Sequence, residues 1–134
     1  MQIALDTNIF VNIFNGQEEA DRCYDAIAKA LRSYHHCCIS ASAVTDIFYI
    51  VSKRIGSADA RVAVNAMLGL ARVFDVNEKD VRTALESGIK DFEDAVFVSA
   101  AKRNGADLIL TYNKKDFKNA GINVMTPAEY LRTN

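Results

Sequence analysis

The most informative part of the chain runs from Asp91 to Thr111 and reads DFEDAVFVSAAKRNGADLILT. Residues 95–101 are apolar around most of a helix, which indicates a helix near the centre of the molecule. Asn104-Gly105 ends that helix, and residues 107–111 follow as the clearest strand in the chain. A short strand that is apolar at successive positions is typical of a parallel sheet covered on both faces.

Similar short apolar segments lie on both sides of this stretch, separated by segments with helical spacing. The strands are expected at residues 3–5, 37–40, 73–76, 107–111 and 122–125. The helices are expected at residues 9–14, 18–34, 43–55 (capped by Ser42), 58–72, 77–88, 91–104 and from Thr126-Pro127 onward. Strands that alternate with helices form parallel βαβ units. The sequence therefore predicts an α/β fold, a three-layer α/β/α sandwich with a central parallel sheet of four or five strands.

Composition places the chain among ordinary globular proteins. The 134 residues are 50% apolar and 25% charged, with a net charge of −1, and this length fits a single domain over residues 1–134. The charge balance argues against a strongly basic nucleic-acid scaffold. No apolar run is long enough for a membrane span, the N-terminus does not read as a secretory signal, and the three cysteines do not suggest a disulfide framework. We expect a cytoplasmic protein with no membrane association.

Four of the acidic residues fall where a parallel sheet binds its ligands, outside the carboxyl ends of the strands. Asp6 ends the first strand, Asp46 lies early in the helix after the second, Asp94 lies in the first turn of the central helix, and Asp116 follows the strand at 107–111. Oxygen-only ligands suit Mg²⁺ or Mn²⁺ and not Zn²⁺. Such a cluster, with one or two ions, suits phosphodiester hydrolysis by a metal-activated water.

Each of these acids also has a purely structural interpretation. Asp6 fits a helix cap, Asp46 a surface charge, and Asp116 a turn residue. Asp94 fits a capping box with Asp91. Chance placement of all four at one edge is less probable than any single alternative, so we expect them to converge.

Three motifs resemble those of the PIN domain family, and of its VapC-like toxin ribonucleases in particular. They are Asp6-Thr7-Asn8-Ile9, Asp91-Phe92-Glu93-Asp94-Ala95 and the segment LTYNKKDF at residues 110–117. Their order and spacing cover nearly the whole chain. The resemblance implies a metal-dependent endoribonuclease that cleaves single-stranded RNA, often the toxin of a toxin–antitoxin pair and often a homodimer.

The resemblance also implies roles for individual residues. Asp6, Asp94 and Asp116 match metal-binding acids. Asp46 stands where the family usually has a glutamate, so its shorter side chain puts direct ligation in doubt. A further set of polar residues matches those that line the site and hold the metal or its ligands: Asn8, Thr111 and Asn113.

Residues around these motifs suggest contacts with RNA. Tyr112 stands where an arginine is common, and would replace a phosphate contact with a base-stacking surface. Substrate phosphates are expected near a set of basic residues: Lys53, Arg54, Lys114 and Lys115.

Two other functions are compatible with the sequence. A phosphatase of the haloacid-dehalogenase type would use Asp6 as a nucleophile, although Asn8 stands where that chemistry needs an aspartate. A non-catalytic PIN-like module would bind protein or RNA, and an antitoxin or a second copy could use the surplus of apolar side chains at residues 9–14 and at Phe48-Tyr49.

Overall fold

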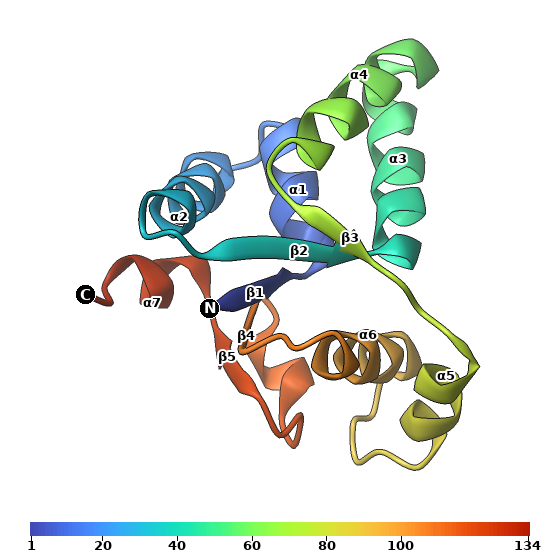
Figure 1. The fold of residues 1–134 in the computed structure, drawn as a ribbon. Helices are drawn as coiled ribbons and strands as arrows, with labels where there is room; N and C mark the ends of the chain where they lie inside the picture. The colour runs from blue at the N-terminus through green and yellow to red at the C-terminus, as the bar shows by residue number, and fades with distance from the viewer.

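The computed structural model describes all of residues 1–134 and contains a five-stranded, fully parallel sheet between two layers of helices (Figure 1). The strands are β1 (Gln2–Leu5), β2 (His36–Ser40), β3 (Arg72–Phe74), β4 (Leu108–Leu110) and β5 (Asn123–Met125). Their order across the sheet is β3-β2-β1-β4-β5. The predicted α/β/α sandwich is confirmed, with the upper of the two expected strand numbers.

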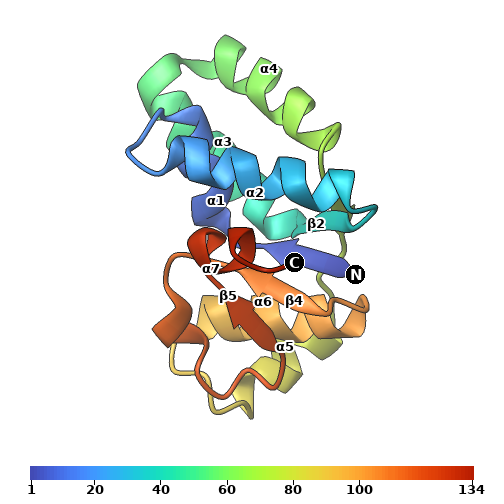
Figure 2. The same ribbon diagram turned by 90° about the vertical axis from the view of Figure 1, so that its left-hand side faces the viewer.

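The helices divide between the two faces of the sheet, as the two views show (Figures 1 and 2). One layer holds α1 (Thr7–Phe14), α2 (Ala20–Arg32), α3 (Ala41–Ile55) and α4 (Ser57–Leu68), with the short α7 (Pro127–Leu131) packed against α2. The other holds α5 (Glu78–Leu85), α6 (Phe92–Arg103) and the 3₁₀ helix η1 (Lys114–Phe117). In this second layer α5 and α6 pack closely on one another.

The strand order places a topological switch between β1 and β4. From β1 the chain moves outward to β2 and β3, and it then returns to β4 on the other side of β1. Because parallel crossovers are right-handed, this reversal sends the later helices to the opposite face. The loops after β1 and β4 therefore diverge to opposite faces and leave a crevice at their carboxyl ends, where open α/β sheets bind their ligands.

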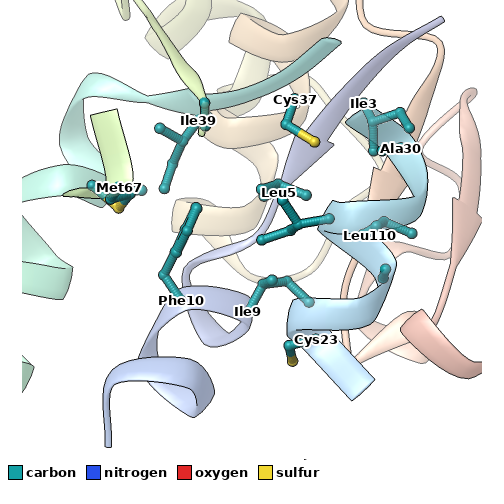
Figure 3. Close-up of a cluster of buried hydrophobic side chains, with 14 of the residues drawn as sticks. Ile3, Leu5, Ile9, Phe10, Cys23, Ala30, Cys37, Ile39, Met67 and Leu110 are labelled. Carbon is teal, nitrogen blue, oxygen red and sulfur yellow. The ribbon is translucent and has the colours of Figure 1, made fainter. Parts of the chain in front are cut away.

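Alternate side chains of each strand build two separate hydrophobic cores. Ile3 and Leu5 of β1 point into the larger core, with α1 to α4, whereas Ala4 points into the smaller core with α5 and α6. Figure 3 shows the larger core, where the Leu5 side chain of β1 lies next to Ile9 and Phe10 of α1. The sheet is thus covered on both faces, which explains why its strands are apolar at successive positions.

The ends of several elements differ from the sequence prediction. Ser40, and not Ser42, caps α3, because its hydroxyl accepts a hydrogen bond from the Ala43 amide at 3.1 Å. Helix α4 ends at Leu68, and β3 begins at Arg72, which pairs with Cys38 of β2. Pairing with β2 therefore shortens the helix that had been expected to reach Arg72.

No helix of the chain is both long enough and apolar enough to cross a bilayer.

Candidate functional site

Asp6 lies at the switch point, directly after β1, and its carboxylate is held by several donors. The Thr111 hydroxyl, at the end of β4, donates to Oδ2 at 2.7 Å, and the Asn8 amide donates to the same oxygen at 3.2 Å. The backbone amide of Thr7 donates to Oδ1 at 2.8 Å. Asp6 therefore caps α1, as its structural interpretation required, and also presents a fixed carboxylate at the carboxyl edge of the sheet.

Three more acidic side chains lie across a small pocket from Asp6. Asp46 comes from the second turn of α3, and Glu93 and Asp94 come from the first turn of α6. The pocket has a volume of about 20 Å³, which is room for one water molecule or one ion. Its full lining is Asp6, Thr7, Ser40, Ser42, Ala43, Asp46, Glu93, Asp94 and Phe97.

Asp94 and Asp91 have different roles at the start of α6. Asp91 is the N-cap, and its Oδ1 accepts a hydrogen bond from the Asp94 amide at 3.0 Å. The Asp94 side chain does not return a bond to the Asp91 backbone, so the reciprocal capping box is not formed. The Asp94 carboxyl is therefore free to face the pocket.

Asp116 approaches the pocket from η1, which follows β4. Its own side chain is exposed, whereas Phe117 beside it is buried and contacts the ring of Phe97 edge-on, with 6.1 Å between the ring centroids. The Asp116 amide donates to the Asn113 carbonyl at 2.9 Å. The buried Phe117 thus fixes η1 on the smaller core, and Asp116 lies close enough for its charge to act on Asp6 and Asp94.

The electrostatics of these residues show an excess of negative charge. Burial raises the pKa of Asp94 to about 7, and the neighbouring carboxylates of Asp6, Asp91, Asp116 and Glu93 add to that rise. Burial also raises the pKa of Asp6, although the hydrogen bond from Thr111 opposes the increase.

Glu93 adds a further carboxyl to this excess of charge. Burial raises its pKa, with contributions from the charge of Asp46 and from a hydrogen bond shared with that side chain. No lysine or arginine forms an ion pair with any of Asp6, Asp46, Glu93, Asp94 or Asp116.

The donor chemistry of the pocket fits a hard divalent cation. All of its charged groups are carboxylates, their charge is uncompensated, and hydroxyl and amide groups support them. The side chains are not drawn together around one point, however, since no group of three or more His, Cys, Asp or Glu is placed to hold an ion in common. Mutual repulsion of unneutralised carboxylates favours such separation.

Two of the predicted site residues contribute in a different manner from that expected. The exposed Asn113 acts through its backbone, since its amide donates to the Thr111 hydroxyl oxygen at 3.0 Å. The Tyr112 side chain turns away from the pocket, and its hydroxyl meets Cys23 at 3.1 Å and Glu19 at 3.3 Å. The ring is partly buried against the larger core, and the hydroxyl links the end of β4 to α2 and the residue before it.

The structure also separates the basic residues that were expected near substrate. Lys53 and Arg54 lie in the last turn of α3, at the end distant from the sheet (Figure 1), and Lys53 covers the ring of Tyr49 at 4.4 Å. Lys114 is paired with Glu129 at 2.9 Å. Lys115 alone of these four lies beside an acid of the site, next to Asp116.

Glu93 is the functional candidate that the sequence prediction missed. It lies in one of the three motifs, but acidic residues in the first turn of a helix are common because they complement the helix dipole. Its one distinguishing signal is its position beside Asp94. The Ser40 hydroxyl was missed as well, because Ser42 had been expected to be the cap.

Comparisons with known proteins find relatives that match nearly the whole chain. Ribonuclease VapC1 of Aquifex aeolicus (strain VF5) is 26% identical over 136 residues, which cover 96% of this chain and 92% of the relative. The structure of VapBC2 from Rickettsia felis, bound to a DNA fragment from its promoter, matches with a TM-score of 0.76 and 21% identity, over 94% of this chain and 98% of that chain. The Mycobacterium tuberculosis toxin VapC20, which cleaves the sarcin–ricin loop, matches with a TM-score of 0.68 and 18% identity, over 90% and 95% of the two chains.

A family model agrees with these pairwise matches and spans most of the chain. The model of the PIN domain matches residues 2–115, a range that contains β1 to β4 and, of the site, Asp6, Asp46, Glu93 and Asp94. The chain therefore belongs to the PIN domain family.

Proposed function

We propose that the protein is a metal-dependent endoribonuclease that cleaves single-stranded RNA and acts as the toxin of a toxin–antitoxin pair. The observation that carries the proposal is the gathering of uncompensated carboxylates at the switch point, where burial and the neighbouring negative charges together raise the pKa of Asp94 to about 7. Support comes from the relative named ribonuclease VapC1 and from membership of the PIN domain family.

In this proposal Asp6, Asp94 and Asp116 hold Mg²⁺ or Mn²⁺, and Asp46 assists at the pocket wall. A bound ion would lower the pKa of the water molecule that acts as nucleophile, and would neutralise charge on the phosphodiester. Thr111 and Asn8 fix the Asp6 carboxylate by donating to its Oδ2. Asn113 fixes Thr111 in turn, through the backbone amide that donates to the hydroxyl oxygen.

Protonation of Asp94 controls the ability of the pocket to receive a cation. With a pKa near 7, its carboxyl is partly protonated at neutral pH before any ion binds. Because only the carboxylate form is a ligand, ion binding displaces that proton. The affinity for a divalent cation is therefore expected to rise between about pH 6 and pH 8.

A partner protein is part of the proposal. The solved relatives include VapBC2, a complex bound to promoter DNA, and the toxin–antitoxin complex from Klebsiella pneumoniae. Exposed apolar side chains on the outer surface of α3 and α4, with Val62 69% and Leu68 48% exposed, offer a surface for an antitoxin or for a second copy in a homodimer. We propose that the protein acts in the cytoplasm, where it would meet both RNA and an antitoxin.

The test is cleavage of single-stranded RNA in Mn²⁺ by the native chain and by Asp6→Asn and Asp94→Asn. We expect each variant to lose more than about 100-fold in rate, the upper end of what loss of a supporting contact costs at a metal site. Asp59→Asn, which neutralises an exposed acid in the first turn of α4, is the matched control and should retain full activity. Undiminished cleavage by Asp6→Asn would remove the assignment.

RNA cleavage, titration with Mn²⁺ and an aryl phosphate assay together separate the alternatives. A non-catalytic binding module would show no cleavage by the native chain and no heat on titration with Mn²⁺. A phosphatase of the haloacid-dehalogenase type would release phosphate from an aryl phosphate, but membership of the PIN domain family leaves that alternative without support.

A further inference from the structure

A second and larger pocket lies beside the acidic site. It has a volume of about 500 Å³, within the range of pockets that hold small organic ligands. One wall is the loop between α5 and α6, with Lys90 and Asp91, and the other is η1 with its following turn, with Lys115, Asp116 and Lys118. We call it the lysine pocket.

The three lysines of this pocket are available to a ligand. Lys90, Lys115 and Lys118 are exposed, and none of their ammonium groups takes part in an ion pair, side-chain hydrogen bond or cation–π contact. Lys114, one residue earlier on the same helix, is by contrast neutralised by Glu129. The chain thus leaves positive charge free on the side of η1 that faces the lysine pocket.

Both walls of the lysine pocket are anchored in the smaller core. On one side Ile89 is buried and its amide donates to the Ser87 hydroxyl at 3.3 Å. On the other side Phe117 and Ala120 are buried, and the Ala120 amide donates to the Phe117 carbonyl at 3.1 Å. The backbone that carries the lysines is therefore fixed before any ligand arrives, which lowers the ordering cost of binding.

Two acids of the lysine pocket lie close to the acidic site. Asp116 lines it and also raises, by its charge, the pKa values of Asp6 and Asp94. Asp91 lines it and caps the helix that carries Asp94. A chain bound in the lysine pocket would therefore lead directly to the carboxylates.

We propose that the lysine pocket holds the sugar–phosphate backbone of single-stranded RNA on one side of the bond to be cleaved. This inference rests on the proposed ribonuclease function. The lining of the pocket contains no apolar or aromatic residue, so it offers phosphate contacts from Lys90, Lys115 and Lys118 and no surface for base stacking. The contact is consequently independent of base sequence.

The local charge explains how a chain with a net charge of −1 would bind a polyanion. The acidic site by itself repels phosphate, whereas the three free lysines of the adjoining pocket outnumber its two acids. RNA affinity then depends on this local patch and falls with salt as counterions are displaced.

The test measures the binding of a fluorescent 20-nucleotide RNA by anisotropy over a series of NaCl concentrations, in an Asp6→Asn background that prevents cleavage. The triple variant Lys90→Gln, Lys115→Gln and Lys118→Gln should shift the slope of log affinity against log salt by about 2, since each phosphate contact on a single strand contributes about 0.7. The control triple Arg32→Gln, Lys79→Gln and Arg132→Gln removes the same charge from exposed positions elsewhere.

An unchanged slope in the lysine-pocket variant, or an equal change in the control, would overturn the inference. Binding of poly-glutamate as tight as that of the RNA would also overturn the inference, because it would indicate a site for acidic protein. Thermal melting of each variant checks folding, and the single variant Lys90→Gln, expected to shift the slope by about 0.7, provides the same test with less change to the chain.

Cleavage assays separate failure of this inference from failure of the proposed function. With all other residues native, the lysine-pocket variant should cleave long RNA at least about tenfold more slowly at low substrate, yet cleave a dinucleotide at the native rate. Equal rates on long RNA would contradict the lysine pocket alone. Absence of cleavage by the native chain would contradict the ribonuclease proposal, while the salt slopes would still report on the pocket.

Discussion

At the scale of single residues, Asp6 combines a structural and a chemical role. Its Oδ1 accepts from the Thr7 amide at the start of α1, and its Oδ2 accepts from Thr111 and Asn8. A capping carboxylate at the carboxyl end of β1 is thus already desolvated, oriented and directed toward the crevice. The sequence could predict this residue because both roles depend on its position directly after a strand.

Replacement of Thr111 by valine tests how Asp6 is held. In the native chain the Thr111 hydroxyl donates to Asp6 at 2.7 Å, and this hydrogen bond lowers the pKa of Asp6. Thr111→Val removes the hydroxyl and should therefore raise that pKa. We expect the free energy of unfolding to fall by about 1–2 kcal/mol, and the acidic limb of the pH–rate profile for RNA cleavage to move to higher pH. Thr111→Ser, which keeps the hydroxyl, should behave as the native chain, and an unmoved acidic limb in Thr111→Val would contradict this role.

Glu93 shows the limit of prediction at this scale. Acids at helix starts stabilise the helix dipole wherever the helix lies, so sequence alone does not separate Glu93 from exposed acids such as Asp59. Only the meeting of the first turns of α3 and α6 at the carboxyl edge of the sheet brings Glu93 within reach of Asp46. The contact of Tyr112 with Cys23 shows the same limit, because the two residues are 89 positions apart in the chain.

At the scale of elements, one arginine joins α6 to the segment between β3 and α5. Arg103 donates to both carboxylate oxygens of Asp80, at 2.8 and 2.9 Å, and to Asp75 at 2.8 Å. Asp80 is only 2% exposed and also completes the capping box of α5 with Asn77. This network fixes α5 against α6, and with it the loop that carries Lys90 and Asp91.

Substitution at Asp80 tests that connection. Asp80→Asn should lower the free energy of unfolding by about 2 kcal/mol, the value for the loss of a hydrogen bond to a charged group. The loss is no larger because the Arg103 guanidinium, without its partner, still contacts water. Glu78→Gln, which breaks an ion pair with Arg82 between two highly exposed side chains, should change it by no more than about 0.5 kcal/mol. Urea denaturation measures both, and equal effects would contradict the assignment.

The same network predicts a dependence of stability on pH. Hydrogen bonds from Arg103 lower the pKa values of Asp80 and Asp75 in the folded chain. A carboxylate with a lowered pKa stabilises the fold above its unfolded pKa near 4 and loses that contribution as the pH falls through the folded value. The unfolding free energy should therefore decrease below about pH 4, and the decrease should be smaller in Asp80→Asn.

Element boundaries were less predictable than element types. Ser40 and Ser42 are both good caps, and the choice between them depends on where β2 stops pairing with β3, at Phe74. In the same way, the bounds of β3 at Arg72–Phe74 follow from its pairing with residues 38–40 of β2. The sequence contains the propensities, but the pairing partners that select among them come from distant segments.

At the scale of the whole molecule, the two cores share the same sheet. Phe10 belongs to the core between the sheet and α1–α4, and Phe97 to the core with α5 and α6. The strands that are apolar at successive positions, with helices between them, made this layered arrangement predictable. The strand order was not predictable from local pattern, because no segment specifies on which side of β1 the strand β4 is added.

A shared sheet predicts a single cooperative unfolding transition. Phe10→Ala and Phe97→Ala should each lower the unfolding free energy by about 3–5 kcal/mol, and far- and near-ultraviolet circular dichroism should report the same midpoint in each variant. Tyr34→Ala, at a side chain 90% exposed, should leave the midpoint unchanged. Separate transitions for the two cores would contradict the description of residues 1–134 as one domain.

Anomalous scattering from crystals grown with Mn²⁺ would show whether Asp6, Asp94 and Asp116 together bind one divalent cation. We predict an anomalous peak bound by these carboxylates, with Asp94 drawn toward Asp6, and its loss in Asp6→Asn. A vacant pocket at saturating Mn²⁺ and pH 8, where the Asp94 carboxyl with its pKa of about 7 is ionised, would contradict the account.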